Sequence, residues 1–265
     1  MHVGDYELAA NLSLLFTEHE YPDRFAAARA AGFTAVESWW PFPTASPSTT
    51  EVDALCSAVE TAGVRLAALN FFAGDMAAGE RGVVSQPARR AEFLASLAVV
   101  RTVHDRTGCP VFNALYGARV PGMSAEEQDA CAVRNLGTAV AALPSSASLV
   151  VEALTVGENG DYPLTTCAEV VSVLDAVGPR VGLLFDTYHL TNNGEDLVAA
   201  IGRYGHRIGH VQFADSPGRH EPGTGSVDFA AVLSALSANG CPGVVAAEYR
   251  PAGETVAGLG WVAAL

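Results

Sequence analysis

The feature that most constrains the fold is a regular alternation of short apolar runs with longer helix-like stretches along the whole chain. Apolar runs of about four to eight residues, bounded by turn signals, are typical of buried strands. Such runs occupy residues 9–15, 34–39, 64–70, 111–115, 147–153, 181–185, 208–213 and 243–248. Helical patterns lie between them, at residues 22–32, 51–62, 87–107, 166–176, 193–204 and 227–238, and a capping box at Ser124 and Glu127 opens another helix.

Eight strands that alternate with helices predict an α/β fold, a single (β/α)8 TIM barrel. A doubly wound open sheet is the alternative. It normally carries a glycine-rich phosphate loop after its first strand, and residues 14–21 contain no such loop. The length of 265 residues is usual for one barrel, so we expect a single TIM-barrel domain over residues 1–265.

The charge and the cysteines narrow the functional classes. A net charge of −14 repels phosphate backbones, so we expect a small-molecule substrate and no nucleic acid. The chain contains no apolar run of about 18 residues and no basic segment at its start, which predicts no membrane span and no secretory signal. Five cysteines without a Cys-x-x-Cys pair indicate free thiols and a cytoplasmic protein. A homo-oligomer is left open.

Four oxygen-bearing side chains occur at the ends of consecutive predicted strands, namely Glu152, Asp186, Gln212 and Glu248. In a barrel these strand ends meet at one rim, and three carboxylates so close together need a counter-charge. An all-oxygen ligand set suits Mg²⁺ or Mn²⁺ better than Zn²⁺. The sequence therefore predicts a site for one divalent metal ion, Mg²⁺ or Mn²⁺. An ordinary ion pair at the rim is the alternative for any one of these residues.

Further polar residues are candidates for substrate binding, each with a structural alternative. His189 either faces the substrate or is a satisfied core histidine. Arg219, in the glycine-rich loop 215–225, either holds a substrate carboxylate bidentately or pairs with Glu221. The loop 72–82 is a lid or a structural Ω-loop. The remaining candidates either line the pocket or fill the barrel mouth: Glu37, Trp39, Trp40, Asn70, Asn113 and, in the loop after the fifth strand, Glu158.

Several stretches resemble the hydroxypyruvate isomerase family, within the xylose-isomerase-like barrel superfamily. They are residues 11–18, 69–82, 185–189 and 207–225, with residues 248–251 matching the final strand. The stretch RIGHVQFADSPGRHEPGTG at 207–225 is long and specific, and the resemblance covers nearly the whole chain.

The resemblance implies a proton shift, through an enediolate, between hydroxypyruvate and tartronate semialdehyde (2-hydroxy-3-oxopropanoate), or isomerisation of a 2-oxo-tetronate. It implies that Glu152 and Glu248 are the proton donor and acceptor, and that the metal is held by these two residues with Asp186 and Gln212. By analogy with the related ketose epimerases, it implies that His189 and Arg219 contact the substrate.

The chain departs from the family pattern beside this site. The family has Pro, Asn and an Arg-Asp pair before a Pro-Gly turn, where residues 153–163 read ALTVGENGDYP, and Thr191 replaces a frequent Gln. Other functions therefore stay open. A ketose 3-epimerase would use the same glutamates on a neutral sugar. A DNA-repair nuclease is disfavoured by the charge and by few histidines at strand ends, and a non-catalytic binding module by the paired glutamates.

Overall fold

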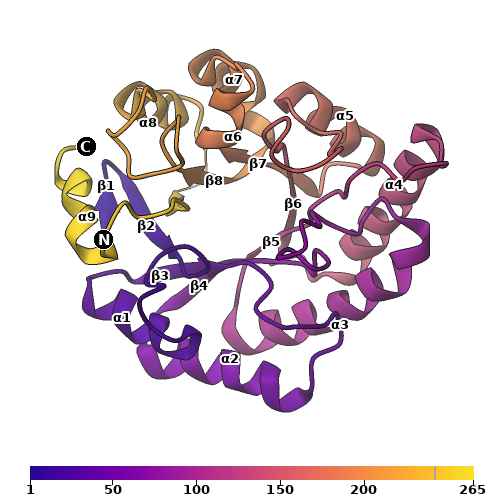
Figure 1. The fold of residues 1–265 in the computed structure, drawn as a ribbon, viewed down its shortest axis with the longest axis horizontal. Helices are drawn as coiled ribbons and strands as arrows, with labels where there is room; N and C mark the ends of the chain where they lie inside the picture. Colours follow the sequence, from indigo (N-terminus) through magenta and orange to yellow (C-terminus); the bar gives the residue numbers. More distant parts are fainter. Residues whose placement is uncertain (242) are drawn as a thin grey trace.

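In the computed structural model, which describes residues 1–241 and 243–265, eight parallel strands close into a barrel that is surrounded by helices (Figure 1). The barrel closes because β2 pairs with β9, with Ala10 opposite Ala247. A short β1 (His2–Val3) pairs antiparallel with β2. The barrel strands are β2 (Tyr6–Asn11), β3 (Ala35–Ser38), β4 (Arg65–Asn70), β5 (Val111–Asn113), β6 (Ser148–Glu152), β7 (Val181–Asp186), β8 (Ile208–Phe213) and β9 (Val244–Ala247). The predicted (β/α)8 TIM barrel is confirmed.

The helices form the outer ring of Figure 1, and their apolar faces pack on the sheet. The predicted capping box is present, since Ser124 Oγ accepts from the Glu127 amide at 3.2 Å. None of the helices in the described part of the chain is long and apolar enough to span a membrane. The helices are α1 (Arg24–Ala30), α2 (Thr49–Ala62), α3 (Arg90–Thr107), α4 (Ala125–Ala142), α5 (Cys167–Val177), α6 (Thr187–Asn192), α7 (Leu197–Tyr204), α8 (Phe229–Ala238) and α9 (Thr255–Gly258).

Two predicted boundaries are wrong. The strand expected at 9–15 is β2, which ends at Asn11 because the Asn11 side chain accepts from the Ser13 amide at 2.9 Å and turns the chain. The helix expected at 193–204 begins only at Leu197, and the separate helix α6 starts directly after β7. Asp186 causes that early start, since its side chain caps α6.

Strand alternation decides which side chains enter the barrel. Ala9, Ala35, Ala67 and Ala246 form a separate buried cluster of small residues. Positions two residues further along a strand point to the same face. Asn11, Glu37 and Glu248 therefore follow these alanines on the inward face, towards the carboxyl ends of the strands, where active sites of TIM barrels lie. The interior of the barrel is thus filled by small apolar side chains at the level of these alanines and carries polar side chains at the carboxyl ends of the strands.

Candidate active site

A cavity of about 210 Å³ opens at the carboxyl ends of the strands. Six of the predicted site residues line it: Asn70, Glu152, Glu158, His189, Arg219 and Glu248. Asp186 and Gln212 do not line it, but both lie buried next to residues that do. Trp39, which the sequence also offered as a lining residue, is part of the wall, and the wall is completed by Met76, Arg81, Leu115, Leu154, Asn159 and Arg250. The structure thus brings all the predicted side chains to one end of the barrel.

Three buried carboxylates, those of Glu152, Asp186 and Glu248, lie at this end of the barrel, and a guanidinium group joins two of them. Arg219 Nη2 lies 2.9 Å from Glu248 Oε1 and 3.3 Å from Asp186 Oδ2. Glu152 Oε2 accepts from Asn113 Nδ2 at 2.9 Å. Arg219 therefore pairs with these acids and not with Glu221, which was the alternative from sequence.

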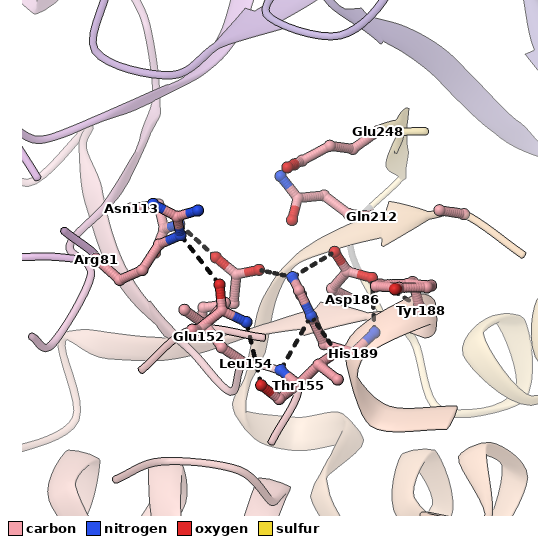
Figure 2. Close-up of polar contacts among 12 residues, drawn as sticks. Arg81, Asn113, Glu152, Leu154, Thr155, Asp186, Tyr188, His189, Gln212 and Glu248 are labelled. Atoms are coloured by element: carbon pink, nitrogen blue, oxygen red, sulfur yellow. Dashed lines mark hydrogen bonds and ion pairs between the residues drawn. The ribbon is translucent and has the colours of Figure 1, made fainter. Parts of the chain in front are cut away.

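Gln212 has its amide group oriented by Glu37 below it. Gln212 Nε2 donates to Glu37 Oε1 at 2.9 Å, and the same carboxylate accepts from Asn11 Nδ2 at 2.8 Å and contacts His210 Nε2 at 2.5 Å. The amide nitrogen is held by Glu37, and Gln212 Oε1 has no hydrogen-bond partner within the described residues. Figure 2 draws this oxygen pointing towards His189 and Asp186. Glu37 is thus part of the support under the site, and not of the cavity wall.

The site has donor atoms and charge that fit a divalent cation. Gln212 Oε1 and Glu248 Oε2 are buried and have no hydrogen-bond partner within the described residues. Buried acceptors without a partner are costly and call for an explanation such as a bound ion. Three carboxylates and one guanidinium sum to about −2, which a divalent cation would neutralise. Glu152, Asp186, Gln212 and Glu248 could therefore hold Mg²⁺ or Mn²⁺ through oxygen.

The same crowding raises the proton affinity of the acids. Burial, together with the negative charge of Asp186, raises the pKa of Glu152 to about 8. Burial also raises the pKa of Glu248 well above its ordinary value, although Arg219 opposes the rise. Carboxyl groups with such pKa values can exchange protons near neutral pH, as acid–base catalysis requires.

His189 lies on α6 between these acids and Thr155. Burial and the charges of Arg219 and Arg81 hold the pKa of His189 well below its ordinary value, so the ring is neutral. The Thr155 backbone N–H lies 3.1 Å from Nδ1 and can only donate, which leaves the proton on Nε2. Nε2 lies 3.7 Å from Glu152 Oε1 and 3.8 Å from Asp186 Oδ2. His189, Glu152 and Asp186 have ligand atoms within 4.8 Å of one another, but a protonated Nε2 is a donor and not a metal ligand.

The loop that carries Arg219 is folded around one buried carboxylate. Asp215 accepts from the backbone amides of Ser216, Gly223, Gly225 and Val227 at 2.8–3.0 Å. A Cβ at Gly225 would lie 2.2 Å from the Ser216 carbonyl oxygen, so glycine is required there. Arg219 itself has φ +56°, a left-handed conformation that is costly for a residue with a side chain. The loop therefore fixes the Arg219 backbone in a strained conformation, from which the side chain reaches Asp186 and Glu248.

Several residues of the site were missed from sequence, and three of them make contacts that organise it. Arg81, in the loop 72–82, donates from Nε to Asn159 Oδ1 at 3.0 Å, and both side chains line the cavity. Thr155 fixes the His189 tautomer. Asn159 and Thr155 both lie in the segment 153–163 that departs from the family pattern, so no motif pointed to them. Glu158, which was predicted, lies exposed at the mouth and accepts from the Tyr188 hydroxyl at 2.9 Å.

Comparison with known proteins gives the family. Residues 25–265 match the model of the xylose isomerase-like TIM barrel family. The chain is 45% identical to the "Putative hydroxypyruvate isomerase" of Streptomyces coelicolor over 95% of this chain and 93% of the relative. It is 30% identical to the "Hydroxypyruvate isomerase" of Escherichia coli, covering 96% and 97% of the two chains. It is 31% identical to the "2-oxo-tetronate isomerase" of Cupriavidus necator, covering 96% of each.

Among solved structures, the crystal structure titled "AP endonuclease, family 2" from Brucella melitensis superposes with a TM-score of 0.90 at 29% identity, covering 98% of both chains. Together with the barrel and the buried acids at its carboxyl end, these matches place the chain. It belongs to the xylose isomerase-like TIM barrel family and, within it, to the hydroxypyruvate isomerase family, whose members are isomerases, and this protein is an isomerase.

Proposed function

We propose that this protein is a metal-dependent isomerase that interconverts hydroxypyruvate and 2-hydroxy-3-oxopropanoate. The observation that carries the proposal is the set of four oxygen-bearing side chains at one rim, in which Gln212 Oε1 and Glu248 Oε2 are buried without a partner among the described residues. The names of relatives at 45% and 30% identity support this substrate.

Each residue has a role that its contacts support. Glu152, Asp186, Gln212 and Glu248 would hold the cation, and a divalent cation bound there would polarise the substrate carbonyl and acidify the neighbouring C–H. Asn113 fixes Glu152 Oε2, and Arg219 fixes Glu248 Oε1. Each glutamate therefore has one anchored oxygen and one that is not anchored.

The two glutamates move the proton between adjacent carbons of the substrate. One glutamate, as the carboxylate, removes a proton from the carbon that carries the hydroxyl and gives an enediolate. The other glutamate, in its protonated form, gives its proton to the carbonyl carbon, and the hydroxyl proton passes to the former carbonyl oxygen. His189 Nε2–H donates to a substrate oxygen during the transfer. Positioned acid–base groups of this kind contribute about 10²–10⁴-fold to a rate. Burial of both glutamates keeps bulk water from the carbanion-like intermediate.

The test is turnover of hydroxypyruvate by the purified protein with Mn²⁺ or Mg²⁺, followed by a coupled assay for 2-hydroxy-3-oxopropanoate. In deuterated water the product should carry deuterium at the newly protonated carbon. Glu152→Gln and Glu248→Gln should each lower kcat by about 10²–10⁴-fold with circular dichroism unchanged. Near-normal kcat in either variant would remove that glutamate from the mechanism, and activity that persists after EDTA dialysis would refute the metal.

A 2-oxo-tetronate is the second candidate substrate, and one feature of the structure favours it. A groove of about 630 Å³ adjoins the cavity and shares Trp39 and Met76 with it, which gives room for a longer carbon chain. A relative at 31% identity carries that name. Comparing kcat/KM for hydroxypyruvate and for a 2-oxo-tetronate decides between the two acids.

Two further alternatives are less well supported. A neutral ketose would leave Arg81 and Arg250, which line the cavity, without an anionic partner. A repair nuclease needs a basic surface for the nucleic acid backbone, whereas this chain has a net charge of −14.

A further inference from the structure

The cavity wall contains a guanidinium group whose charge no acid balances. Arg81 makes three hydrogen bonds, from Nε to Asn159 Oδ1 at 3.0 Å and from Nη1 to the carbonyl oxygens of Met76 and Glu80 at 3.0 and 2.7 Å. All three acceptors are neutral. Within residues 1–241 and 243–265, no carboxylate lies within 4.0 Å of Arg81 and no hydrogen bond engages its Nη2.

Other arginines of the described residues also lack an ion pair, but most of them, Arg250 included, are exposed, whereas Arg81 is half-buried in the cavity wall. Arg89, which follows in the same connection between β4 and α3, contacts Glu80 and Glu92 at 2.6 Å each. Arg219 contacts Glu248 and Asp186. The charge of Arg219 is therefore engaged by the acids of the site, whereas the charge of Arg81 is available to a ligand.

From these contacts we propose that Arg81, positioned by Asn159, binds the carboxylate of the substrate. This role rests on the proposed function, and it means that the enzyme acts on an anion. Arg81 and Glu152 line the same cavity, and Figure 2 draws Arg81 on the Asn113 side of the Glu152 carboxylate. A hydroxy-carbonyl acid can thus reach Arg81 with one end and the acids of the rim with the other. Arg250, also in the wall, adds positive potential.

The backbone keeps Arg81 in this position. Gly82 has φ +107° and forms a bridge with Tyr116. A Cβ at Gly82 would lie 2.0 Å from the Leu115 carbonyl oxygen, so only glycine allows this close approach. Asn159, which is 8% exposed, also donates from Nδ2 to the Thr155 carbonyl oxygen at 3.1 Å. Asn159 therefore connects Arg81 to Thr155, the residue that fixes His189.

The nearby positive charges support the assignment. Arg81, Arg219 and Arg250 line the same cavity, and burial together with the charges of the other two lowers the pKa of Arg81. A bound carboxylate would relieve the repulsion between these charges, and a neutral sugar would not. The cavity is thus selective for an acid at the end that Arg81 faces.

The experiment compares an acid with its neutral analogue in the Mn²⁺-loaded full chain. Kinetics use hydroxypyruvate and dihydroxyacetone, which replaces the carboxylate by a hydroxymethyl group. Calorimetry uses D-glycerate, which has a carboxylate but no carbonyl to isomerise, and glycerol. Arg81→Gln should raise KM for hydroxypyruvate and Kd for D-glycerate by about 10²-fold, as expected for loss of a charge-assisted pair. kcat should change by less than about threefold, because Arg81 does not touch the reacting carbons.

Two further variants separate charge from shape. Arg81→Lys keeps the charge and should recover about tenfold of the lost affinity. Asn159→Asp places a carboxylate on Arg81 and should lower the acid-to-neutral ratio of kcat/KM by about tenfold, even if kcat falls for both substrates through Thr155. The matched control is Arg134→Gln, which removes the same charge from the outer face of α4. It should leave the acid-to-neutral ratio of kcat/KM and the Kd for D-glycerate unchanged.

The outcomes keep the two proposals apart. Unchanged KM and Kd in Arg81→Gln, with the thermal midpoint preserved, overturn the role of Arg81. If Arg81→Gln unfolds, an unchanged ratio in Asn159→Asp overturns it instead. A wild-type protein that binds D-glycerate but does not isomerise hydroxypyruvate refutes the proposed reaction and leaves the calorimetric test of Arg81 intact. Failure of the wild type to bind D-glycerate overturns the inference directly.

Discussion

Replacing Glu248 by glutamine separates metal binding from folding, because the affinity for the metal should fall while the free energy of unfolding should stay the same or rise. Glu248 Oε1 accepts from Trp39 Nε1 and Arg219 Nη2, both at 2.9 Å, and a glutamine oxygen can accept the same two bonds. Glu248 Oε2 is buried and has no partner within the described residues. In the metal-free protein burial raises the pKa of Glu248 well above its ordinary value and so favours the neutral acid, which a neutral amide resembles in shape and charge. We therefore expect the free energy of unfolding to stay within about 1 kcal/mol of the wild type or to rise.

The affinity for Mn²⁺ should instead fall strongly. The substitution changes the local charge from about −2 to about −1 and removes one carboxylate ligand. Loss of a supporting partner alone costs about 10–100-fold in metal affinity, so loss of a ligand should cost at least about 100-fold, or about 2.7 kcal/mol. Calorimetric titration with Mn²⁺ measures the affinity, and urea unfolding in EDTA measures the stability.

The matched control is Glu158→Gln, which removes the same charge at the mouth of the cavity and should change Mn²⁺ affinity by less than about threefold. Equal Mn²⁺ affinity in Glu248→Gln and the wild type would refute the ligand assignment. If Glu248→Gln lost several kcal/mol of unfolding free energy in EDTA, Glu248 would be needed for folding.

Three further predictions test the surroundings of the site. Glu37→Gln should weaken Mn²⁺ binding about 10–100-fold in calorimetry, because it frees the Gln212 amide to turn its nitrogen inward; unchanged affinity would contradict the orienting role. In EDTA the thermal midpoint should decrease as pH is raised from 6.5 to 8. The pKa of Glu152 is about 8 in the folded protein and 4.5 ordinarily, so the stabilisation from protonated Glu152 is complete below pH 4.5 and lost as pH rises to 8. Glu152→Gln should make the thermal midpoint less dependent on pH in this range. An equally steep dependence in the variant would contradict its assignment to Glu152. Gly82→Ala should cost at least about 1–3 kcal/mol in urea unfolding, since φ is +107° and the added Cβ meets backbone; a neutral effect would contradict the required glycine.

The barrel could be predicted from the sequence because its signal is local and repeated. Each buried strand is a short apolar run, most of the longer helices show their own periodicity, and several begin with a capping box, as at Ser124 and Glu127. The first strand was misplaced because the apolar run continues past Asn11, while the turn that ends the strand depends on one side-chain hydrogen bond. Such a contact leaves no trace in hydrophobic periodicity.

The site could be predicted only where its residues occupy strand ends. Barrel geometry brings Glu152, Asp186, Gln212 and Glu248 to one rim whatever the loops do. The partners of Arg219 and the role of Arg81 depend instead on how loops distant in sequence meet, such as the contact between Arg81 and Asn159, 78 residues apart. Loop contacts of this kind follow from tertiary packing and not from spacing.

The most direct measurement is the anomalous difference density of manganese in crystals grown with Mn²⁺. We expect one peak per chain, about 2.0–2.3 Å from oxygen atoms of Glu152, Asp186, Gln212 and Glu248. A peak at another position, or no peak at a Mn²⁺ concentration that supports activity, would contradict the claim that these four side chains hold the cation.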